Sequence, residues 1–254
     1  MGIFSTLSDI GVMTSRNLMR YRRVPQLIVF SSIQPVMFTL LFAYVFGGAI
    51  TTPGFSYVNY LIPGILVQTV LFGAMQTGVG LADDLSRGMI DRFRSLPMAR
   101  MAVLAGRTIS ESIRNIFVIA LIVGVGFLIG FRLEHGWGKF LLALILALGF
   151  GFAFSWVSAT IGLLVKNIET VQVAGFIWVF PLAFASSIFV PVATMKTGLR
   201  VFAEHNPVTY TVNVVRAAAL GGPIGHDLWY SLAWIIGILV IFVPLAVNRY
   251  RKNS

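Results

Sequence analysis

The sequence contains no cysteine, which excludes disulfide bonds and thiolate metal sites. It is also poor in charge, because Asp, Glu, Lys and Arg make up only 11% of its 254 residues. Soluble domains carry about 25% charged residues. Hydrophobic residues instead make up 57% of the chain. So little charge cannot cover a surface that faces water, and the composition therefore predicts an integral membrane protein.

Signatures of catalysis and nucleotide binding are missing as well. The chain has no GxxxxGK[ST] phosphate loop, and its only Gly-Lys pair is Gly138-Lys139. The three histidines, at positions 135, 205 and 226, do not have the spacing of metal ligands. No nucleophile–base set or pair of carboxylates is placed for catalysis. We therefore expect a chain that is not itself an enzyme and that binds no cofactor.

Long charge-free runs dominate what is present. Residues 24–82 contain no charged side chain, and the Gly- and Thr-containing stretch 47–56 divides this run in two. A helix needs about 20 apolar residues to cross a bilayer. The sequence therefore predicts an all-α membrane protein with one domain, residues 1–254. Six transmembrane helices are expected at 25–47, 58–82, 108–131, 138–164, 170–192 and 228–248.

The distribution of positive charge predicts the orientation. With six spans, 14 Lys and Arg residues lie on the side of both termini and 5 lie opposite, which accounts for all 19. The positive-inside rule then places both termini in the cytoplasm. Residues 1–24 are expected to form an interfacial helix, with an apolar stripe of Phe4, Leu7, Leu18 and Tyr21 and a basic face of Arg16, Arg20 and Arg23. That basic face would meet lipid headgroups; a flank that only fixes topology is the alternative.

One salt-rich segment, "DDLSRGMIDRFRSLPM" at residues 83–98, interrupts the apolar sequence. Met89, Phe93 and Leu96 recur at helical spacing among mixed acids and bases, and Pro97 ends the pattern. This predicts a short amphipathic helix that docks into a groove of another protein. A helix lying on the inner leaflet is the alternative, but anionic lipids would repel its three aspartates.

Three other patterns lie within the predicted spans. One is an ionisable triplet at Arg107, Glu111 and Arg114. Another is a face of the second span with Gln68, Phe72, Met75 and Gln76. The last is a ridge of small residues at Ala143, Ala147, Gly151, Ser155 and Ala159. The triplet favours ion pairs along the helix or a functional charge site. The glutamine face lines a substrate path or bonds to another helix, and the ridge packs on another helix or on a second subunit.

The region after the fifth predicted span is too polar at its start to cross a membrane and too apolar at its end for an ordinary loop. Residues 194–226 are therefore expected to dip into the outer leaflet and return. The helix after Asn206-Pro207 would end at Gly221-Gly222-Pro223. Non-helical backbone at such depth must be shielded by protein.

Two of these segments carry a resemblance to a known family. In "RGMIDRFRSLPMAR" and the following "LAGR", the matching positions are Asp84, Gly88, Asp91, Phe93, Pro97, Arg100, Gly106 and Arg107. In "NPVTYTVNVVRAAALGG" they are Asn206, Pro207, Tyr210 and Arg216. The sequence resembles the ABC-2 type permeases of the daunorubicin-resistance kind, which are membrane subunits of bacterial ABC exporters. Phe93 departs from the more usual leucine and keeps the surface apolar.

The resemblance implies partners and roles. The salt-rich segment would be a coupling helix held by an ATP-hydrolysing subunit, through Asp83, Asp84, Arg87, Gly88, Asp91, Arg92, Phe93, Leu96, Pro97 and Arg100. The triplet at Arg107, Glu111 and Arg114 would transmit its movement to the spans. The implied partners are two copies of an ABC ATPase subunit, which carry the ATP and Mg²⁺, and a second permease chain, identical or homologous. The implied location is the bacterial inner membrane, among lipids and without nucleic acid.

The cargo is constrained mainly by polarity. Most spans lack charge at mid-membrane, which disfavours ion coupling, and the 21 phenylalanines suit an apolar or amphipathic cargo such as a drug, lipid or polyketide. A polysaccharide or teichoic-acid exporter is the alternative, and it would require a continuous aromatic lane with polar groups. An ATP-independent channel or scramblase would instead place polar residues around mid-span. An anchoring protein gives no reason for the docking helix.

Overall fold

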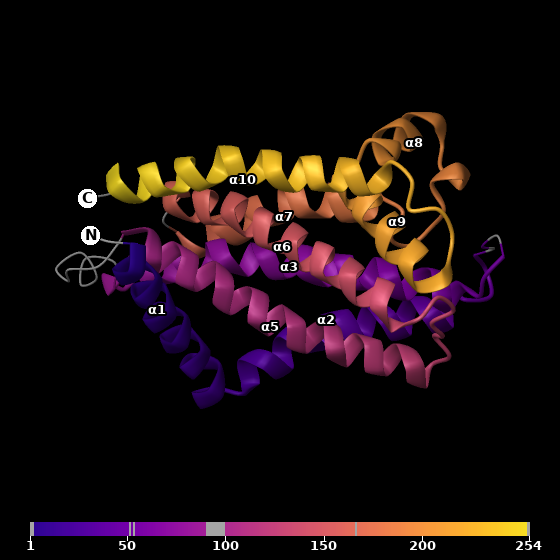
Figure 1. The fold of residues 1–254 in the computed structure, drawn as a ribbon, viewed down its shortest axis with the longest axis horizontal. Coiled ribbons are helices and arrows are strands. Elements are labelled where there is room, and N and C mark those ends of the chain that lie inside the picture. The colour runs from indigo at the N-terminus through magenta and orange to yellow at the C-terminus, as the bar shows by residue number, and fades with distance from the viewer. Residues whose placement is uncertain (1–2, 51, 53, 90–99, 166, 253–254) are drawn as a thin grey trace.

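The computed structural model describes residues 3–50, 52, 54–89, 100–165 and 167–252, without the side chains of residues 3–5, 100 and 252. Within these ranges the chain is helical and contains no strand (Figure 1). The elements are α1 (Ile3–Arg23), α2 (Gln26–Leu41), the π-helical turn η1 (Phe42–Phe46), α3 (Tyr57–Ser86), α5 (Arg100–Leu128), α6 (Trp137–Val165), α7 (Ile168–Phe184), the 3₁₀ turn η2 (Val192–Thr194), α8 (Thr197–Glu204), α9 (Pro207–Leu220) and α10 (Asp227–Lys252).

Five helices of the described chain are long and apolar enough to cross a membrane: Gln26–Phe46, Tyr57–Ser86, Met101–Leu128, Trp137–Val165 and Asp227–Arg251. The protein is therefore a multi-pass membrane protein. The helix expected at 170–192 is shorter than predicted, because α7 has 17 residues and ends at Phe184. Ala185 leaves the helical conformation, with φ −94° and ψ 52°, soon after Pro181.

The two helices beside the salt-rich segment are longer than predicted. Asp83 and Asp84 lie in the last turn of α3, which ends at Ser86, instead of beginning a separate helix. At the other side, α5 begins at Arg100, ahead of the expected start at 108. Charged side chains extend these helices past the apolar run because they find partners of opposite charge on neighbouring helices. Residues 90–99 lie outside the described residues.

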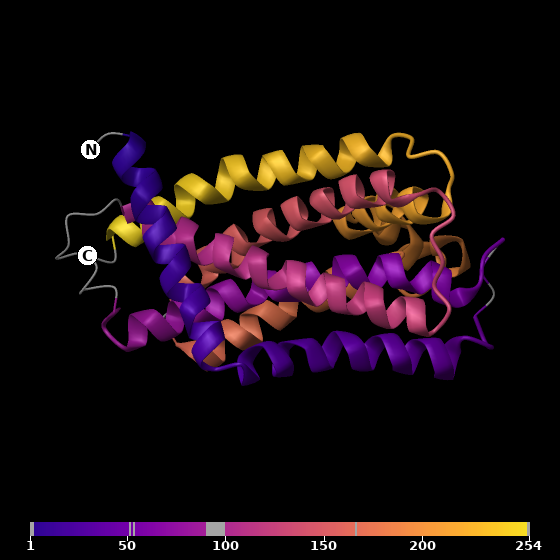
Figure 2. The same ribbon diagram turned by 60° about the horizontal axis from the view of Figure 1, so that its bottom comes forward.

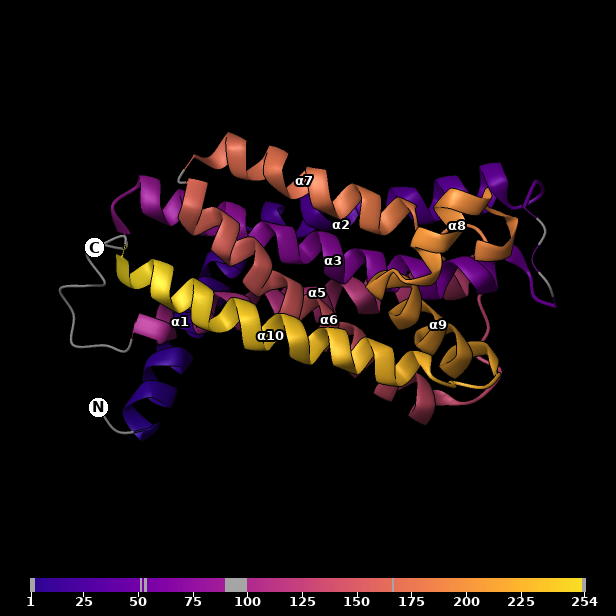
Figure 3. The ribbon, with the colours of Figure 1, turned by 90° about the horizontal axis from the view of Figure 1, so that it is seen from above.

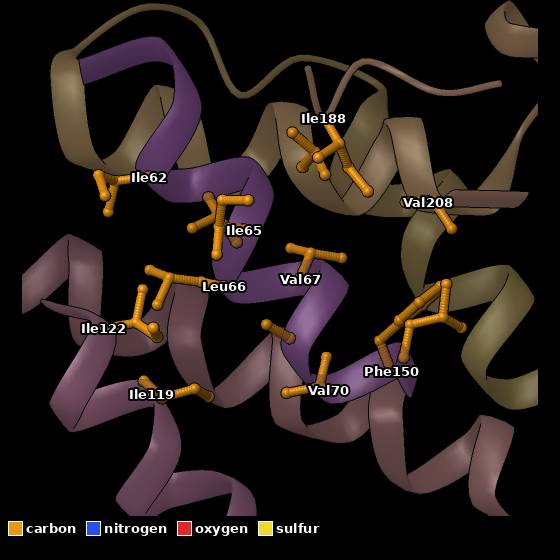
Figure 4. Close-up of a cluster of buried hydrophobic side chains, with 14 of the residues drawn as sticks. Ile62, Ile65, Leu66, Val67, Val70, Ile119, Ile122, Phe150, Ile188 and Val208 are labelled. Carbon is orange, nitrogen blue, oxygen red and sulfur yellow. The ribbon is translucent and has the colours of Figure 1, made fainter. Parts of the chain in front are cut away.

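Helix α3 is the centre of the bundle. In its most apolar stretch of 18 residues, 89% of the residues are buried within the protein. The corresponding shares are 17% for Gln26–Phe46 and 22% for α10. Figure 3 shows α3 running between α7 on one side and α10 on the other. Figure 4 shows its Ile65, Leu66 and Val70 among side chains from α5, α6 and α9. This helix therefore carries little lipid-facing surface and holds the other helices in place.

Helices α3 and α6 pack especially closely because small residues meet between them. A Cβ atom at Gly162 would collide with the carbonyl oxygen of Gly78, and one at Gly151 would lie 2.7 Å from the Cβ atom of Val70. All five residues of the predicted small-residue ridge are buried. Of the two alternatives for this ridge, the structure therefore supports packing within the chain, against α3.

The two ends of the bundle differ in construction. Both chain ends and α1 lie at one end, whereas α8 and α9 lie at the other (Figure 1). Figure 2 shows α1 crossing the first end obliquely. The buried face of α1 contains Met13 and Asn17, and Leu7 of the predicted apolar stripe is 59% exposed. Gly106 of α5 permits this contact, because a Cβ atom there would lie 2.6 Å from Met13 Cβ.

Candidate functional site

A buried ion pair joins the end of α3 to the beginning of α5. The Nη1 atom of Arg107 donates to the Oδ2 atom of Asp84 at 2.9 Å, and their side chains are only 11% and 10% exposed. Gly80 makes room for this pair, because a Cβ atom there would collide with the Arg107 guanidinium. Removing one partner of such a pair leaves the other charge without water and without a counter-charge.

The network continues along α5 and reaches α1. Glu111 Oε2 lies 3.1 Å from Arg114 Nη2, and Glu111 Oε1 lies 4.0 Å from Arg107 Nε. The Tyr21 hydroxyl of α1 donates to Glu111 Oε1 at 2.6 Å. Burial raises the pKa of Tyr21 above its ordinary value, and the neighbouring Glu111 adds to this effect. The predicted triplet is therefore a chain of ion pairs along one helix, to which α1 adds a neutral donor.

The basic face of α1 also turns toward this network. Arg16 Nη2 lies 3.8 Å from Asp84 Oδ2, and Arg20 Nη2 lies 3.4 Å from Asp83 Oδ2. Burial lowers the pKa of Arg16, and Asp84 opposes that shift. Their side chains remain 32% and 47% exposed, so contact of this face with lipid headgroups stays a prediction beside these ion pairs. The two aspartates provide a nearer counter-charge, fixed on a buried helix.

The predicted coupling residues are only partly described. Asp83 also pairs with Arg87, whose Nε atom lies 2.7 Å from its Oδ1 atom. Gly88 has φ +65°, a left-handed conformation that glycine adopts without strain, and it turns the chain out of α3. Arg100 begins α5. The remaining predicted contacts, Asp91, Arg92, Phe93, Leu96 and Pro97, lie outside the described residues.

A cavity of about 450 Å³ adjoins the ion network, between α1, α2, α3, α5 and the start of α7. Arg20, Asp83, Arg107, Glu111 and Arg114 line one part of it. Phe30, Pro35, Phe72 and Val118 line an apolar part. We call this the α2–α5 cavity.

Only part of the predicted glutamine face of α3 lines this cavity. Phe72 and Gln76 line it, and Gln76 is exposed although most of its helix is buried. Gln68 and Met75 are buried elsewhere, and Met75 fills the space that Gly175 leaves on α7. In the described residues Gln68 Oε1 has no hydrogen-bond partner. The four residues therefore do not form one continuous lining.

At the other end of the bundle, Asn206 joins two helices. Its side-chain oxygen accepts from the Val208 N–H and begins α9, with Pro207 in the first turn. Its amide donates to the carbonyl oxygens of Leu182 at 2.8 Å and Ala185 at 2.7 Å. The Asn-Pro pair therefore begins α9 and satisfies free carbonyl groups at the end of α7.

Arg216 of α9 supports the non-helical backbone that follows α7. Its guanidinium donates to the carbonyl oxygens of Ser187 at 2.7 Å and Tyr60 at 3.1 Å, and it lies 3.6 Å from the centre of the Tyr60 ring. Gly64 of α3 lets this segment approach, because a Cβ atom there would lie 2.6 Å from the carbonyl oxygen of Ile188. Tyr210 lies apart from this group, with its ring 5.0 Å from that of Tyr230.

Several residues of these sites were not predicted from the sequence. Tyr57 and Tyr60 donate to the carbonyl oxygens of Phe189 and Ser187 at 3.0 Å, and Tyr21 and Asn17 lie beside the inner ion network. The one available signal was Arg216, an arginine in an apolar helix with no acidic residue within one turn, which requires other acceptors.

In the described residues, no group of three or more His, Asp or Glu side chains could hold a metal ion.

Comparisons with known proteins identify the family of this chain. A family model described as ABC-2 type transporter matches residues 8–220. The chain is 31% identical over 239 residues to the daunorubicin resistance ABC transporter permease protein DrrB1 of Streptomyces coeruleorubidus, covering 94% of this chain and 84% of that protein. It is 28% identical over 244 residues to the "Probable doxorubicin resistance ABC transporter permease protein DrrC" of Mycobacterium tuberculosis H37Rv, covering 95% and 87%. It is 22% identical over 218 residues to the inner membrane transport permease YadH of Escherichia coli K12, covering 83% and 82%. The chain belongs to the ABC-2 type transporter family.

Proposed function

We propose that this chain is the permease subunit of an ATP-driven exporter that moves an apolar or amphipathic compound out of the cytoplasm or the inner leaflet. Two of its relatives are named for daunorubicin or doxorubicin resistance, which supports a drug-like cargo. The ATP and Mg²⁺ would bind to a separate ATPase subunit, present in two copies, and a second permease chain would complete the pathway.

The observation that carries this proposal is the Asp84–Arg107 ion pair. It joins the end of α3 to α5, the two helices at either end of the segment 83–98 that the sequence predicts to contact the ATPase. Because the pair is buried and connected to Glu111, Arg114 and α1, a displacement of this segment would move α3 and α5 together. Helix α3 contacts α5, α6, α7 and α9, so such a displacement would reach most of the bundle.

The proposed topology has six crossings and both termini in the cytoplasm. Helix α7 would be the short fifth crossing, and α8 and α9 would form the outer re-entrant region. The shielding of residues 185–189 by Arg216, Tyr57 and Tyr60 supports this placement, because non-helical backbone inside a membrane needs partners from the protein.

A ladder of aromatic rings supports an apolar cargo. Successive ring centroids lie 4.3–5.2 Å apart along Phe176, Phe180, Phe184, Phe189, Phe42 and Phe46. The ring centroids of Phe72, which lines the α2–α5 cavity, and Phe180 lie 5.7 Å apart, so the ladder passes beside that cavity. Every member is phenylalanine and offers no hydrogen bond to sugar hydroxyls. The ladder therefore favours a drug or lipid over a polysaccharide.

Purification of the tagged chain from its native membrane in mild detergent tests this proposal. We expect an ATPase subunit to copurify in stoichiometric amount and to hydrolyse ATP. The reconstituted complex should move an apolar dye outward when ATP is supplied. A chain that purifies alone and moves lipid or solute without ATP would contradict the proposal and would favour a channel or scramblase.

A matched pair of variants tests the coupling role directly. The sequence predicts Asp84 as an ATPase contact, but its side chain is buried against Arg107. Asp84→Asn should therefore keep the ATPase bound but lower dye transport per ATP hydrolysed. Arg200→Gln, which breaks an exposed Arg200–Glu204 pair at the opposite end, should change neither. Normal transport by the Asp84 variant would remove the ion pair from the mechanism.

A further inference from the structure

The lining of the α2–α5 cavity combines charged and apolar residues. Arg20, Arg107 and Arg114 oppose Asp83 and Glu111 in its lining, which leaves one positive charge in excess. The rest of the ion network adds Arg16 and Arg87 but only Asp84, so the excess grows to two. Leu27 and Phe30 of α2, with Phe72 and Val118, supply the apolar lining. An anionic group is therefore favoured beside the arginines and hydrocarbon beside the apolar residues.

Two buried donors in this lining have no acceptor within the part of the chain that the structure describes. Among the described residues, Asn17 Nδ2 and Arg114 Nε find no hydrogen-bond partner, although each residue is only 8% exposed. Glu111 Oε2 also makes no hydrogen bond to a described residue, but Arg114 Nη2 lies 3.1 Å away as its ionic partner. Leaving a buried donor unpaired costs roughly 1–3 kcal/mol, so paired donors are the rule. Both donors require an acceptor oxygen, which a phosphate provides.

The shape of the cavity also suits an amphiphile. Its lining on α3 runs from Asp83 to Thr69, and a rise of 1.5 Å per residue gives a length of about 21 Å. Phe30 is 69% exposed and Gln76 is exposed, so the cavity opens to the surroundings of the bundle beside α2. Its volume of about 450 Å³ lies in the range of ligand sites. A hydrocarbon chain can thus lie against Phe30 and Phe72 while its head reaches the arginines.

We infer that the α2–α5 cavity binds an anionic phospholipid from the leaflet on the side of the chain termini. The phosphate accepts hydrogen bonds from Asn17 and Arg114, and an acyl chain lies along α2 and α3. Basic pockets between transmembrane helices recognise anionic headgroups by this chemistry. The inference depends on the membrane placement of the bundle and is independent of ATP coupling.

Native mass spectrometry of the full chain in detergent with added lipid tests this site. We expect phosphatidylglycerol to stay bound, one molecule per chain, at collision energies that strip phosphatidylcholine. Equal retention of the two lipids would overturn the inference. Millimolar inorganic phosphate should not displace the lipid. Displacement would show that the site binds only the anionic group, and it would overturn the inference. Extraction of the protein purified from native membranes should yield an anionic phospholipid. Recovery of a different anion would indicate that the cavity binds the transported compound, and it would overturn the inference.

Matched variants locate the binding. Asn17→Ala removes one donor without changing charge, and Arg114→Gln with Glu111→Gln removes the ion pair as a neutral unit. Each should weaken phosphatidylglycerol retention roughly tenfold, as expected for hydrogen bonds to a charged group. Arg200→Gln removes a positive charge at the opposite end and should leave retention unchanged. Wild-type retention by both folded cavity variants, judged by gel filtration, would overturn the assignment. An equal loss in the Arg200 variant would do the same.

Discussion

At the scale of residues, the protein keeps buried arginines in two different ways. Arg107 is neutralised by a carboxylate, with Asp84 at 2.9 Å. Arg216 instead donates to the backbone oxygens of Tyr60 and Ser187 and stacks on an aromatic ring. Charges at such depth are costly and persist when they hold structure or serve function. The two arginines therefore predict different consequences of substitution.

Arg107→Gln should destabilise the protein by about 3 kcal/mol, because Asp84 would remain buried and, among the described residues, would keep Arg16 as its ionic partner at 3.8 Å. The double variant Asp84→Asn with Arg107→Gln should be more stable than Arg107→Gln, since neither position then carries an unpaired charge. Thermal unfolding in detergent, followed by gel filtration, measures both. A double variant that is less stable than either single variant would contradict a direct ionic interaction.

Arg216→Met should lower the unfolding midpoint in the same assay, because the carbonyl oxygens of Ser187 and Tyr60 each lose a donor, at a cost of roughly 1–3 kcal/mol in total. The Tyr60 hydroxyl still donates to Ser187 in this variant. Arg132→Met is the control. Arg132 is exposed and donates to the carbonyl oxygens of Phe127 and Phe131 near the surface. Equal losses for the two variants would mean that Arg216 does not hold the segment after α7.

At the scale of elements, close contact between α3 and α6 depends on the absence of side chains. Gly78 lies against Ser158 and Gly162, and Gly151 lies against Val70. In a membrane, helices gain little from excluding hydrocarbon, so association relies on close packing of small residues. The ridge on α6 was predicted from sequence spacing, but its partner was not, because spacing describes only one of the two surfaces.

Gly162→Ala should destabilise the bundle, because the added Cβ atom collides with the Gly78 carbonyl oxygen. Gly149→Ala on the same helix is the matched control, since nothing lies within 4 Å of its Cβ position. That control should be neutral or slightly stabilising, by up to about 1 kcal/mol, because alanine is the better helix former. Opposite shifts in thermal midpoint are expected; shifts of the same sign would show that α6 is not packed in this register.

At the scale of the whole molecule, the two ends of the bundle hold different groups of residues. The end with the termini gathers the ion network, the α2–α5 cavity and the flanks of the salt-rich segment. The other end holds a broken backbone segment in place with tyrosines and one arginine. This polarity agrees with the excess of positive charge on the side of the termini and predicts which end faces the cytoplasm.

Single cysteines test that orientation cleanly, because the chain has none of its own. Ser8→Cys places a thiol on exposed α1, and Gly198→Cys places one on exposed α8. A maleimide that cannot cross membranes should label the position 198 variant in intact cells, and the position 8 variant only after permeabilisation. The reverse pattern would invert the topology and move the proposed ATPase contact to the wrong side.

The sequence by itself determined the class of the protein and the approximate position of its helices, because hydrophobic length and charge distribution are local properties. It also predicted the face shared by Arg107, Glu111 and Arg114, since helical spacing alone places them together. The early end of α7 was missed because the residue that satisfies its last carbonyl groups, Asn206, lies more than twenty positions away in the chain.

Only the tertiary structure decided which charges meet and where a cavity remains. Asp84 pairs with Arg107, and Arg16 and Arg20 of α1 lie beside the aspartates of α3. Which face of α1 is buried, and which members of the glutamine face line a cavity, likewise depend on how neighbouring helices pack. Such contacts join residues far apart in the chain, and the energies of burial and pairing that select them exist only once the helices are assembled.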